Sequence, residues 1–253
     1  MSEINPTESK QPETVAAARL AAEVRPVADL TPAERDSMYA IMSGHFLNVS
    51  RAQFLQDLSE KQSVVVMKDA AEGRLRGFST IGRITATVDG QTVTGHFSGD
   101  TVIEPEFWGE HAWLSVWAAH SFAQADKLAP APLYWVLLTA THRSYRLLAN
   151  LFKEYYPRHD QPTPERVQSQ LDALVRVKFP AEYDAGRGVV YLKNQTPVRP
   201  DRVDPATAER DAPEVRYFRE ANPGYASGDF LACMTRLSRD NITPLGRRVL
   251  GTN

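Results

Sequence analysis

The sequence predicts a mixed α/β fold (α+β), in which helices flank a central and mostly antiparallel β-sheet. The chain has 253 residues, of which 42% are hydrophobic and 24% charged, an ordinary globular composition. Its helix and strand patterns do not alternate strictly, so a purely parallel sheet is not expected. The pair Asp89-Gly90 separates two long strand-like segments, and both residues tolerate the positive φ that a hairpin turn requires.

The first part of the chain is predicted to hold a tail, one strand and two helices. Residues 1–22 are rich in Pro, Glu and Ser and then in Ala, which is typical of a flexible tail. A strand is predicted at residues 24–28. Residues 31–34 place Thr at the N-cap, Pro at the first helical position and Glu at the third, so a helix starts there. Ser50 begins a second helix.

The middle of the chain carries the clearest patterns. A β-branched run typical of a buried strand is followed by the two hairpin strands, and then by helix, apolar strand and amphipathic helix. In order, the expected ranges are 64–67, 77–88, 91–103, 110–127, 133–139 and 144–155.

Beyond Pro157 the chain changes character. A helix is expected at 164–177, strands are expected at 188–192 and 229–234, and residues 195–215 look irregular because they are rich in Pro, Asp and Arg. We therefore expect a tail at 1–22, a core at 23–160 and a C-terminal extension at 161–253.

Composition excludes several classes of function. The formal net charge is −2, from 29 basic and 31 acidic residues, so no nucleic-acid partner is expected. No apolar run reaches the roughly 18 residues of a membrane span, and no secretory signal pattern opens the chain. A single cysteine, Cys233, excludes an internal disulfide. The histidines lack metal-ligand spacing, so no metal is expected. These features favour a cytoplasmic location.

Residues 101–109 carry a resemblance to a known family. They read as a hydrophobic strand end followed by Pro105, an aromatic residue at Phe107 and then Gly109. Together with the element order over about residues 24–157, this segment resembles the GNAT acyltransferase superfamily. The resemblance implies a pantetheine thioester donor, either acyl-CoA or an acyl-carrier-protein thioester, and an amine acceptor.

The resemblance also implies a donor site around the end of the predicted strand 91–103. The strand end would splay and bond the pantetheine through its backbone, and the turn that follows would hold phosphate at a helix N-terminus. The positions so assigned are Val102, Ile103, Trp108, Gly109, Glu110 and His111, with Ser144 at the start of the second family motif.

The turn departs from the family pattern in chemistry. Trp108 stands where the family usually has arginine, and Glu110 and His111 stand where it has small residues. Glu110 places a negative charge where pyrophosphate would lie. In the second motif, Leu151 replaces the tyrosine that often protonates the leaving thiolate, so Tyr145 is the candidate acid.

Three polar residues on one predicted strand are candidates for proton transfer and substrate binding. His96, Ser98 and Asp100 alternate, so their side chains are expected to share one face. Asp100, together with His96, would take the proton of the amine, and Ser98 would contact the substrate. Equally, the three residues would simply form the solvent face of the strand. Gly99 between them is typical of a bulge.

Other candidates have two interpretations each. Met42 and Phe46 lie on the helix that covers the acceptor site in similar proteins, or they are core residues. The four tryptophans of the central region, Trp108, Trp113, Trp117 and Trp135, are either core residues or the wall of a lipid-acyl pocket.

The sequence as a whole predicts an N-acyltransferase that moves an acyl group from a pantetheine thioester to a small-molecule amine by direct attack. The alternative is a catalytically inactive GNAT-fold module for binding or assembly. An acyl-carrier protein is a possible partner. The acyl chain, the acceptor and the oligomeric state are left open.

Overall fold

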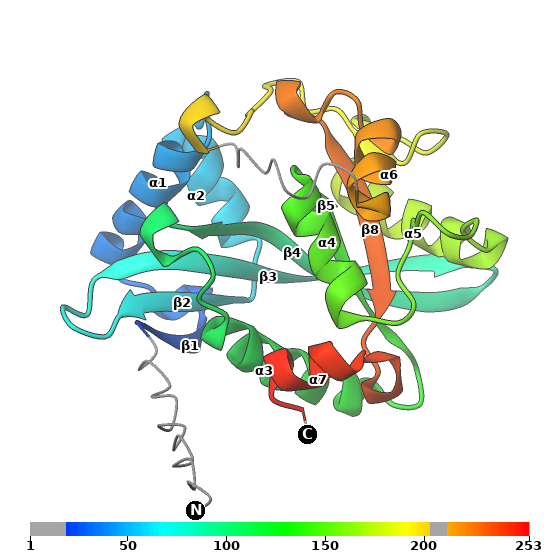
Figure 1. Ribbon diagram of the computed structural model, residues 1–253, viewed down its shortest axis with the longest axis horizontal. Coiled ribbons are helices and arrows are strands. Elements are labelled where there is room, and N and C mark those ends of the chain that lie inside the picture. The colour runs from blue at the N-terminus through cyan, green and yellow to red at the C-terminus, as the bar shows by residue number, and fades with distance from the viewer. Residues whose placement is uncertain (1–18, 203–211, 253) are drawn as a thin grey trace, which may run out of the picture.

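The fold is an eight-stranded mixed sheet with helices on both faces, seen in a computed structural model that describes residues 19–202 and 212–252 (Figure 1). The strand order is β1-β2-β3-β4-β5-β8-β7-β6. Every neighbouring pair is antiparallel except β4 and β5, which are parallel. The predicted mixed, mostly antiparallel sheet flanked by helices is confirmed.

The first elements in the chain are β1 (Leu20–Pro26), α1 (Pro32–His45), α2 (Arg51–Ser59) and β2 (Ser63–Asp69). The strand β1 starts earlier than predicted, so residues 20–22 belong to the sheet rather than to a tail; residues 1–18 lie outside the described range. Leu20 is only 2% exposed and packs into the core, which gives this strand an apolar anchor.

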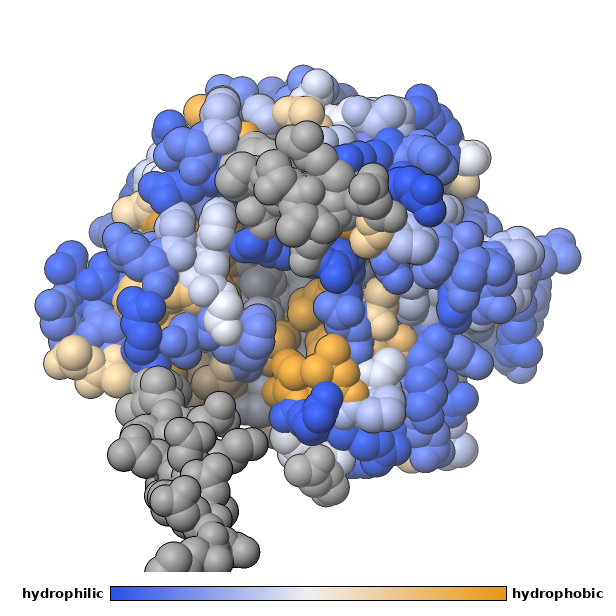
Figure 2. Space-filling view, viewed as in Figure 1, coloured by the Kyte–Doolittle hydropathy of each residue, from blue (hydrophilic) through white to orange (hydrophobic). Residues whose placement is uncertain are grey.

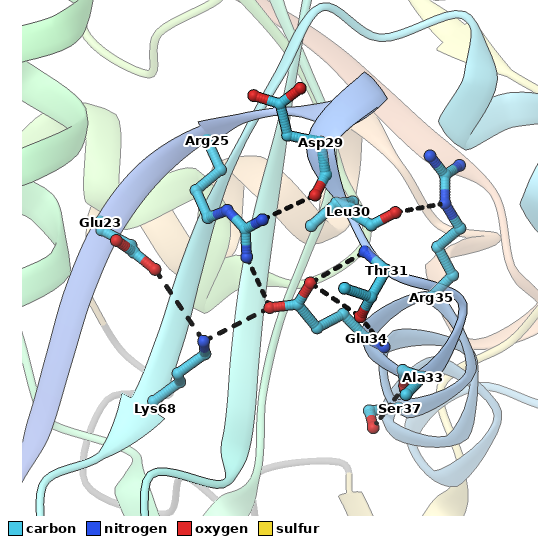
Figure 3. A network of polar contacts seen from close by, with 10 residues as sticks. All are labelled: Glu23, Arg25, Asp29, Leu30, Thr31, Ala33, Glu34, Arg35, Ser37 and Lys68. Carbon is cyan, nitrogen blue, oxygen red and sulfur yellow. Dashed lines mark hydrogen bonds and ion pairs between the residues drawn. The ribbon is translucent and has the colours of Figure 1, made fainter.

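The N-terminus of α1 is fixed by the predicted capping box. Thr31 Oγ1 accepts from the Glu34 amide, and the Glu34 carboxylate accepts from the Thr31 amide at 3.0 Å. The same carboxylate binds Arg25 of β1 at 2.6 Å and Lys68 of β2 at 3.4 Å (Figure 3). The backbone hydrogen bond from Thr31 is the main cause that lowers the pKa of Glu34 to about 2. One side chain therefore ties the start of α1 to two strands.

The hairpin that follows is as predicted. Strands β3 (Leu75–Val88) and β4 (Gln91–Ile103) pair closely, and Asp89 and Gly90 in the turn have φ of 50° and 73°. Next come α3 (Ala112–Leu128), β5 (Leu133–Thr139) and α4 (His142–Leu151).

The C-terminal part completes the same sheet. Its elements are α5 (Glu165–Lys178), β6 (Tyr183–Asp184), β7 (Val189–Val190), α6 (Pro213–Ala221), β8 (Phe230–Arg236) and α7 (Pro244–Leu250). Strand β8 lies between β5 and β7, pairing Cys233 with Leu137 and Phe230 with Val190. The predicted division at residue 160 stays a prediction, but the sheet runs across it.

The faces of the sheet are covered by different helices. Leu148 of α4, Trp117 of α3 and Leu250 of α7 pack into one core cluster with strand residues such as Leu137. On the opposite face, α1 and α2 cover one half of the sheet and α5 covers the other half. In Figure 1, α1 and α2 lie above strands β1–β4, whereas α3 and α7 lie below them.

Candidate functional site

The two parallel strands separate beside a large cavity. Their pairing runs from Thr94 with Leu133 to Ser98 with Leu137 and goes no further, although β4 continues to Ile103. A cavity of about 970 Å³ occupies the region where they part. It is lined by the ends of α1 and α2, by β4 and β5, and by the N-terminal ends of α3 and α4. In the space-filling view, the surface is hollowed near the centre of this face, beside apolar side chains (Figure 2).

A β-bulge in β4 lies at the point of separation. Ile81 pairs with Ser98 but Ser79 pairs with Thr101, so both Gly99 and Asp100 lie opposite Thr80. The Asp100 amide donates to Thr80 Oγ1 at 3.0 Å. The bulge that Gly99 predicted is therefore present, and it interrupts the two-residue alternation of the strand.

The bulge overturns the prediction that His96, Ser98 and Asp100 share one face. Ser98 lies toward α3, where its hydroxyl accepts a hydrogen bond from the Trp135 indole at 2.9 Å. Gly99 faces Lys61 on the other side of the sheet, because a Cβ atom at this glycine would lie 3.0 Å from Lys61 Cε. Asp100 interacts electrostatically with the same lysine. The extra residue, which periodicity cannot reveal, carries Asp100 away from the other two.

The side of the cavity next to Asp100 is rich in charge, and we call it the charged end. It is formed by Asp57, Glu60, Lys61, Asp100 and Lys178, which all line the cavity. Lys178 Nζ lies 3.2 Å from Asp57 Oδ1 and also donates to Glu60, and Lys61 Nζ donates to the Asp57 carbonyl at 3.3 Å.

Burial shifts the proton affinity of the two groups nearest the bulge. It raises the pKa of Asp100, and the charge of Lys61 partly opposes that rise. Lys61 is only 7% exposed, and burial lowers its pKa. A carboxylate with raised proton affinity, placed where the strands part, has the properties of a general base.

The opposite side of the cavity is apolar and aromatic, and we call it the aromatic end. It is formed by Trp113, Leu114 and Trp117 of α3 with Trp135 and Leu137 of β5, and all five line the cavity. The rings of Trp117 and Trp135 lie 4.4 Å apart. Trp113, Trp117 and Trp135 are thus core residues that also line the cavity, and the lipid-acyl interpretation stays a prediction.

The turn after β4 lies at the mouth of the cavity. Trp108, Gly109, Glu110 and His111 all line it, and Gly109 has a φ of 95°. However, the amides of Trp108 and Glu110 already donate within the turn, to Pro105 and Phe107 carbonyls at 3.1 Å. The Trp108 indole donates to the Ile103 carbonyl at 2.9 Å and its ring stacks under Arg143 at 4.7 Å.

The N-terminus of α3 has no side-chain cap, although the Leu114 amide donates to the His111 carbonyl at 2.9 Å. No side chain caps this helix at His111, in contrast to α4, where Thr141 caps through the Ser144 amide. A helix N-terminus without a side-chain cap has unpaired amides and a positive dipole end, which suit an anion. Ser144 also lines the cavity.

Of the remaining predicted positions, Met42, Phe46, Ile103 and Ser98 line the cavity. Val102 instead is 2% exposed and packs against α1 and α2, since the bulge turns it to that face. Only its backbone remains available to the gap between the strands.

Two predicted catalytic side chains lie away from the cavity. His96 packs against Trp117 and His120 at ring distances of 5.9 and 6.2 Å, and burial lowers its pKa to about 3. Tyr145 is completely buried under α6, its hydroxyl donates to the Pro157 carbonyl at 3.0 Å, and burial raises its pKa. Among the described residues, neither is part of the cavity wall. Their expected roles as base and acid do not fit these positions.

A strap from the C-terminal extension was missed by the sequence reasoning. Residues 195–202 run along the end of α1, where Val198 bridges to Phe46. The Leu47 amide donates to Pro197 and the Arg199 amide donates to His45, both at 2.9 Å. Thr196, Val198 and Arg202 line the cavity. Irregular, Pro-rich sequence gives no periodic signal from which this contact could be predicted.

The described residues hold no group of three or more His, Cys, Asp or Glu side chains arranged to bind a metal ion. Within the same residues, no helix is both long and apolar enough to cross a membrane.

No family model and no curated protein matches the chain. Solved structures resemble about half of it. A conserved Enterococcus faecalis protein, named a probable N-acyltransferase, shares 16% identity over 54% of this chain and 33% of its own length, with a TM-score of 0.41. A GNAT family N-acetyltransferase from Escherichia coli in complex with CoA shares 15% identity over 55% of this chain and 71% of its own, with a TM-score of 0.39.

A third example is a GNAT family acetyltransferase from Brucella melitensis in complex with acetyl-CoA. It shares 15% identity over 57% of this chain and 92% of its own length, with a TM-score of 0.36. The chain thus spans a third of the Enterococcus protein and most of the other two. Because these TM-scores are low, the fold is assigned from the strand pairing described above.

Proposed function

We propose that this protein is an N-acyltransferase that moves an acyl group from a pantetheine thioester to a small-molecule amine by direct attack. The observation that carries the proposal is the separation of β4 and β5 after Ser98 and Leu137, directly beside the bulge at Gly99 and Asp100. Beyond that point, β4 has no β5 partner, so its edge is available to bond the amides of a pantetheine arm.

The donor would enter between the N-terminal ends of α3 and α4. The α3 terminus without a side-chain cap suits the phosphate end of the donor. Glu110 and the internally bonded amides of the turn weaken that cradle relative to a standard one. The proposal therefore keeps both donors, acyl-CoA and an acyl-carrier-protein thioester.

The amine would approach from the charged end. As its nitrogen attacks the thioester carbonyl, a C–N bond forms, the C–S bond breaks and the nitrogen must lose a proton. Asp100 lines the cavity and its raised pKa suits it to accept that proton, directly or through water. The positive charge of Lys61 favours the carboxylate form of Asp100, which is the form that can accept a proton.

No side chain is required as the acid. The leaving group is a thiolate, and thiols are acidic enough (about 8.5 for the pKa of a cysteine side chain) that a thiolate departs readily without prior protonation. This removes the need for Tyr145, whose hydroxyl is committed to Pro157. Tyr225 does line the cavity and is the better placed hydroxyl if an acid contributes.

The test measures free thiol released from acetyl-CoA, octanoyl-CoA and octanoyl-acyl-carrier protein with a panel of amines, and identifies the acylated product by mass spectrometry. We expect turnover in the wild type and a loss of at least about 100-fold in Asp100→Asn, the usual size of a general-base contribution. Thioester binding without turnover would favour the inactive binding module instead. Neither binding nor turnover with any thioester would refute both.

A further inference from the structure

We infer that the acyl group carried by the donor is a hydrocarbon chain of several methylenes, and that it lies in the aromatic end of the cavity. This inference rests on the proposed function, because it assigns the acyl part of the same thioester. It begins from the way the bulge in β4 divides one cavity into two ends of opposite character.

The division follows from the strand geometry. Ser98, before the bulge, lies with Trp135 and Trp117, whereas Gly99 and Asp100 face Lys61. A thioester carbonyl bound at the bulge therefore has an apolar region on one side and ionised groups on the other. The acyl chain and the amine leave the reacting carbon in different directions, so each must occupy one of the two ends.

The aromatic end has few groups that would satisfy a polar ligand. The Trp135 indole N–H is already donated to Ser98, which leaves the Trp113 side chain, the ring faces of Trp117 and Trp135, and the side chains of Leu114 and Leu137 as the wall. Polar groups placed against such a wall would lose water without gaining hydrogen bonds, whereas a hydrocarbon chain gains by burial.

The charged end would reject the same chain. Lys61 is 7% exposed, and Lys178 already bridges Asp57 and Glu60. A hydrocarbon chain placed there would displace the remaining water from these charged groups and offer them no hydrogen bonds in exchange. With three carboxylates and two lysines, that end suits a polar or cationic amine. The two substrates are thus assigned to the two ends by their polarity.

The cavity as a whole, with the aromatic end, the charged end and the region beside the turn after β4, is large. Its 970 Å³ lies at the upper limit of the roughly 300–1,000 Å³ of pockets for drug-sized ligands. An acetyl group would place one methyl against the aromatic end and leave its tryptophans without a ligand to contact.

The experiment compares the binding of pantetheine thioesters of increasing chain length, because they lack the phosphates on which the cradle depends. Acetyl-, butanoyl-, octanoyl- and dodecanoyl-pantetheine are titrated into the full chain by calorimetry, with tryptophan fluorescence as a second readout. We expect the dissociation constant to fall by up to about fourfold per methylene until the aromatic end is filled. Octanoyl-pantetheine should shift the tryptophan emission to shorter wavelength, because its chain excludes water from the rings, and acetyl-pantetheine should not.

Leu114 gives a pair of variants with opposite expectations, since it lines the cavity together with Trp113 and Trp117. Leu114→Phe should shorten the preferred chain, and Leu114→Ala should lengthen it. Leu128→Ala is the matched control on the same helix, because Leu128 packs against the core outside the cavity wall. Melting temperatures show whether each variant is folded, and the wild-type series stands without them.

The outcomes separate this inference from the proposed function. Equal affinity for acetyl- and octanoyl-pantetheine, or turnover with acetyl-CoA alone, would overturn the hydrocarbon assignment and leave the acyltransferase standing. Binding of no thioester at any chain length would overturn the proposed function itself. A chain-length dependence that Leu128→Ala shifts as much as Leu114→Phe would also contradict the placement.

Discussion

Replacing Glu34 by glutamine should destabilise the protein at neutral pH and do so much less in acid. The carboxylate accepts hydrogen bonds from the Thr31 amide and hydroxyl at 3.0 Å each, and it pairs with Arg25 and Lys68. These contacts favour the charged form, so the pKa of Glu34 falls from its ordinary value of 4.5 to about 2. Glutamine keeps the shape but loses the charge.

The magnitude follows from that shift. A pKa change of this size corresponds to at most about 3 kcal/mol. The side chain is 17% exposed and the ion pairs are partly screened, so we expect about 1–2 kcal/mol, in line with the loss of a helix cap. Because the folded-state pKa is lowered, this stability is fully present above pH 4.5 and is lost as the pH falls toward about 2.

The assay is urea unfolding of the wild type and Glu34→Gln at pH 7 and at about pH 3. The variant should be less stable by about 1–2 kcal/mol at pH 7, and less than half of that difference should remain at the lower pH. Glu23→Gln is the control, because Glu23 is 59% exposed and lies 3.9 Å from Lys68, and it should cost under about 0.5 kcal/mol. An equal loss at both pH values, or an equal loss in the control, would refute the reasoning.

Three further predictions concern the cavity. Burial raises the pKa of Asp100 and the charge of Lys61 lowers it. In the wild type, kcat/KM should therefore fall as acid protonates Asp100, and in Lys61→Met the acidic limb of the pH profile should move to higher pH. An unchanged acidic limb in Lys61→Met would exclude Asp100 as the base. Arg199→Pro removes the amide that donates to His45 and should raise hydrogen exchange at residues 45–48 and increase KM, whereas unchanged exchange would mean that the strap is not held by this bond. His96→Phe and Tyr145→Phe should keep turnover within about threefold, and Tyr145→Phe should cost about 1 kcal/mol by losing its bond to Pro157, which thermal unfolding measures.

Local signals in the sequence predicted much of the fold. The Asp89-Gly90 turn and the Thr31 cap depend on the conformations and hydrogen bonds of a few neighbouring residues, so they could be recognised without tertiary information. The strands expected at 188–192 and 229–234 are also present, as β7 and β8.

The site was less predictable because it depends on a β-bulge that shifts the alternation of side chains within one strand. Alternation placed Asp100 with Ser98, and a single bulge residue separated them. Lys61 and Lys178 reach the cavity from α2's end and from α5, more than a hundred residues apart, and no local pattern joins them. Tyr145 was the candidate acid because it lies beside the strand end and Leu151 occupies the motif position, but Tyr145 packs against Tyr217 and Phe218 of α6 and is buried.

The position of β8 has a consequence for how the molecule assembles. This strand comes from near the end of the chain, yet it lies inside the sheet, against β5 from almost a hundred residues earlier. Such distant pairing slows folding, because the entropy cost of closing a long loop comes before the strand contacts can stabilise the structure. During synthesis, β5 would have one edge without a pairing partner until β8 had been made. Deleting residues 230–236 would therefore remove an interior strand of the sheet rather than an appendage.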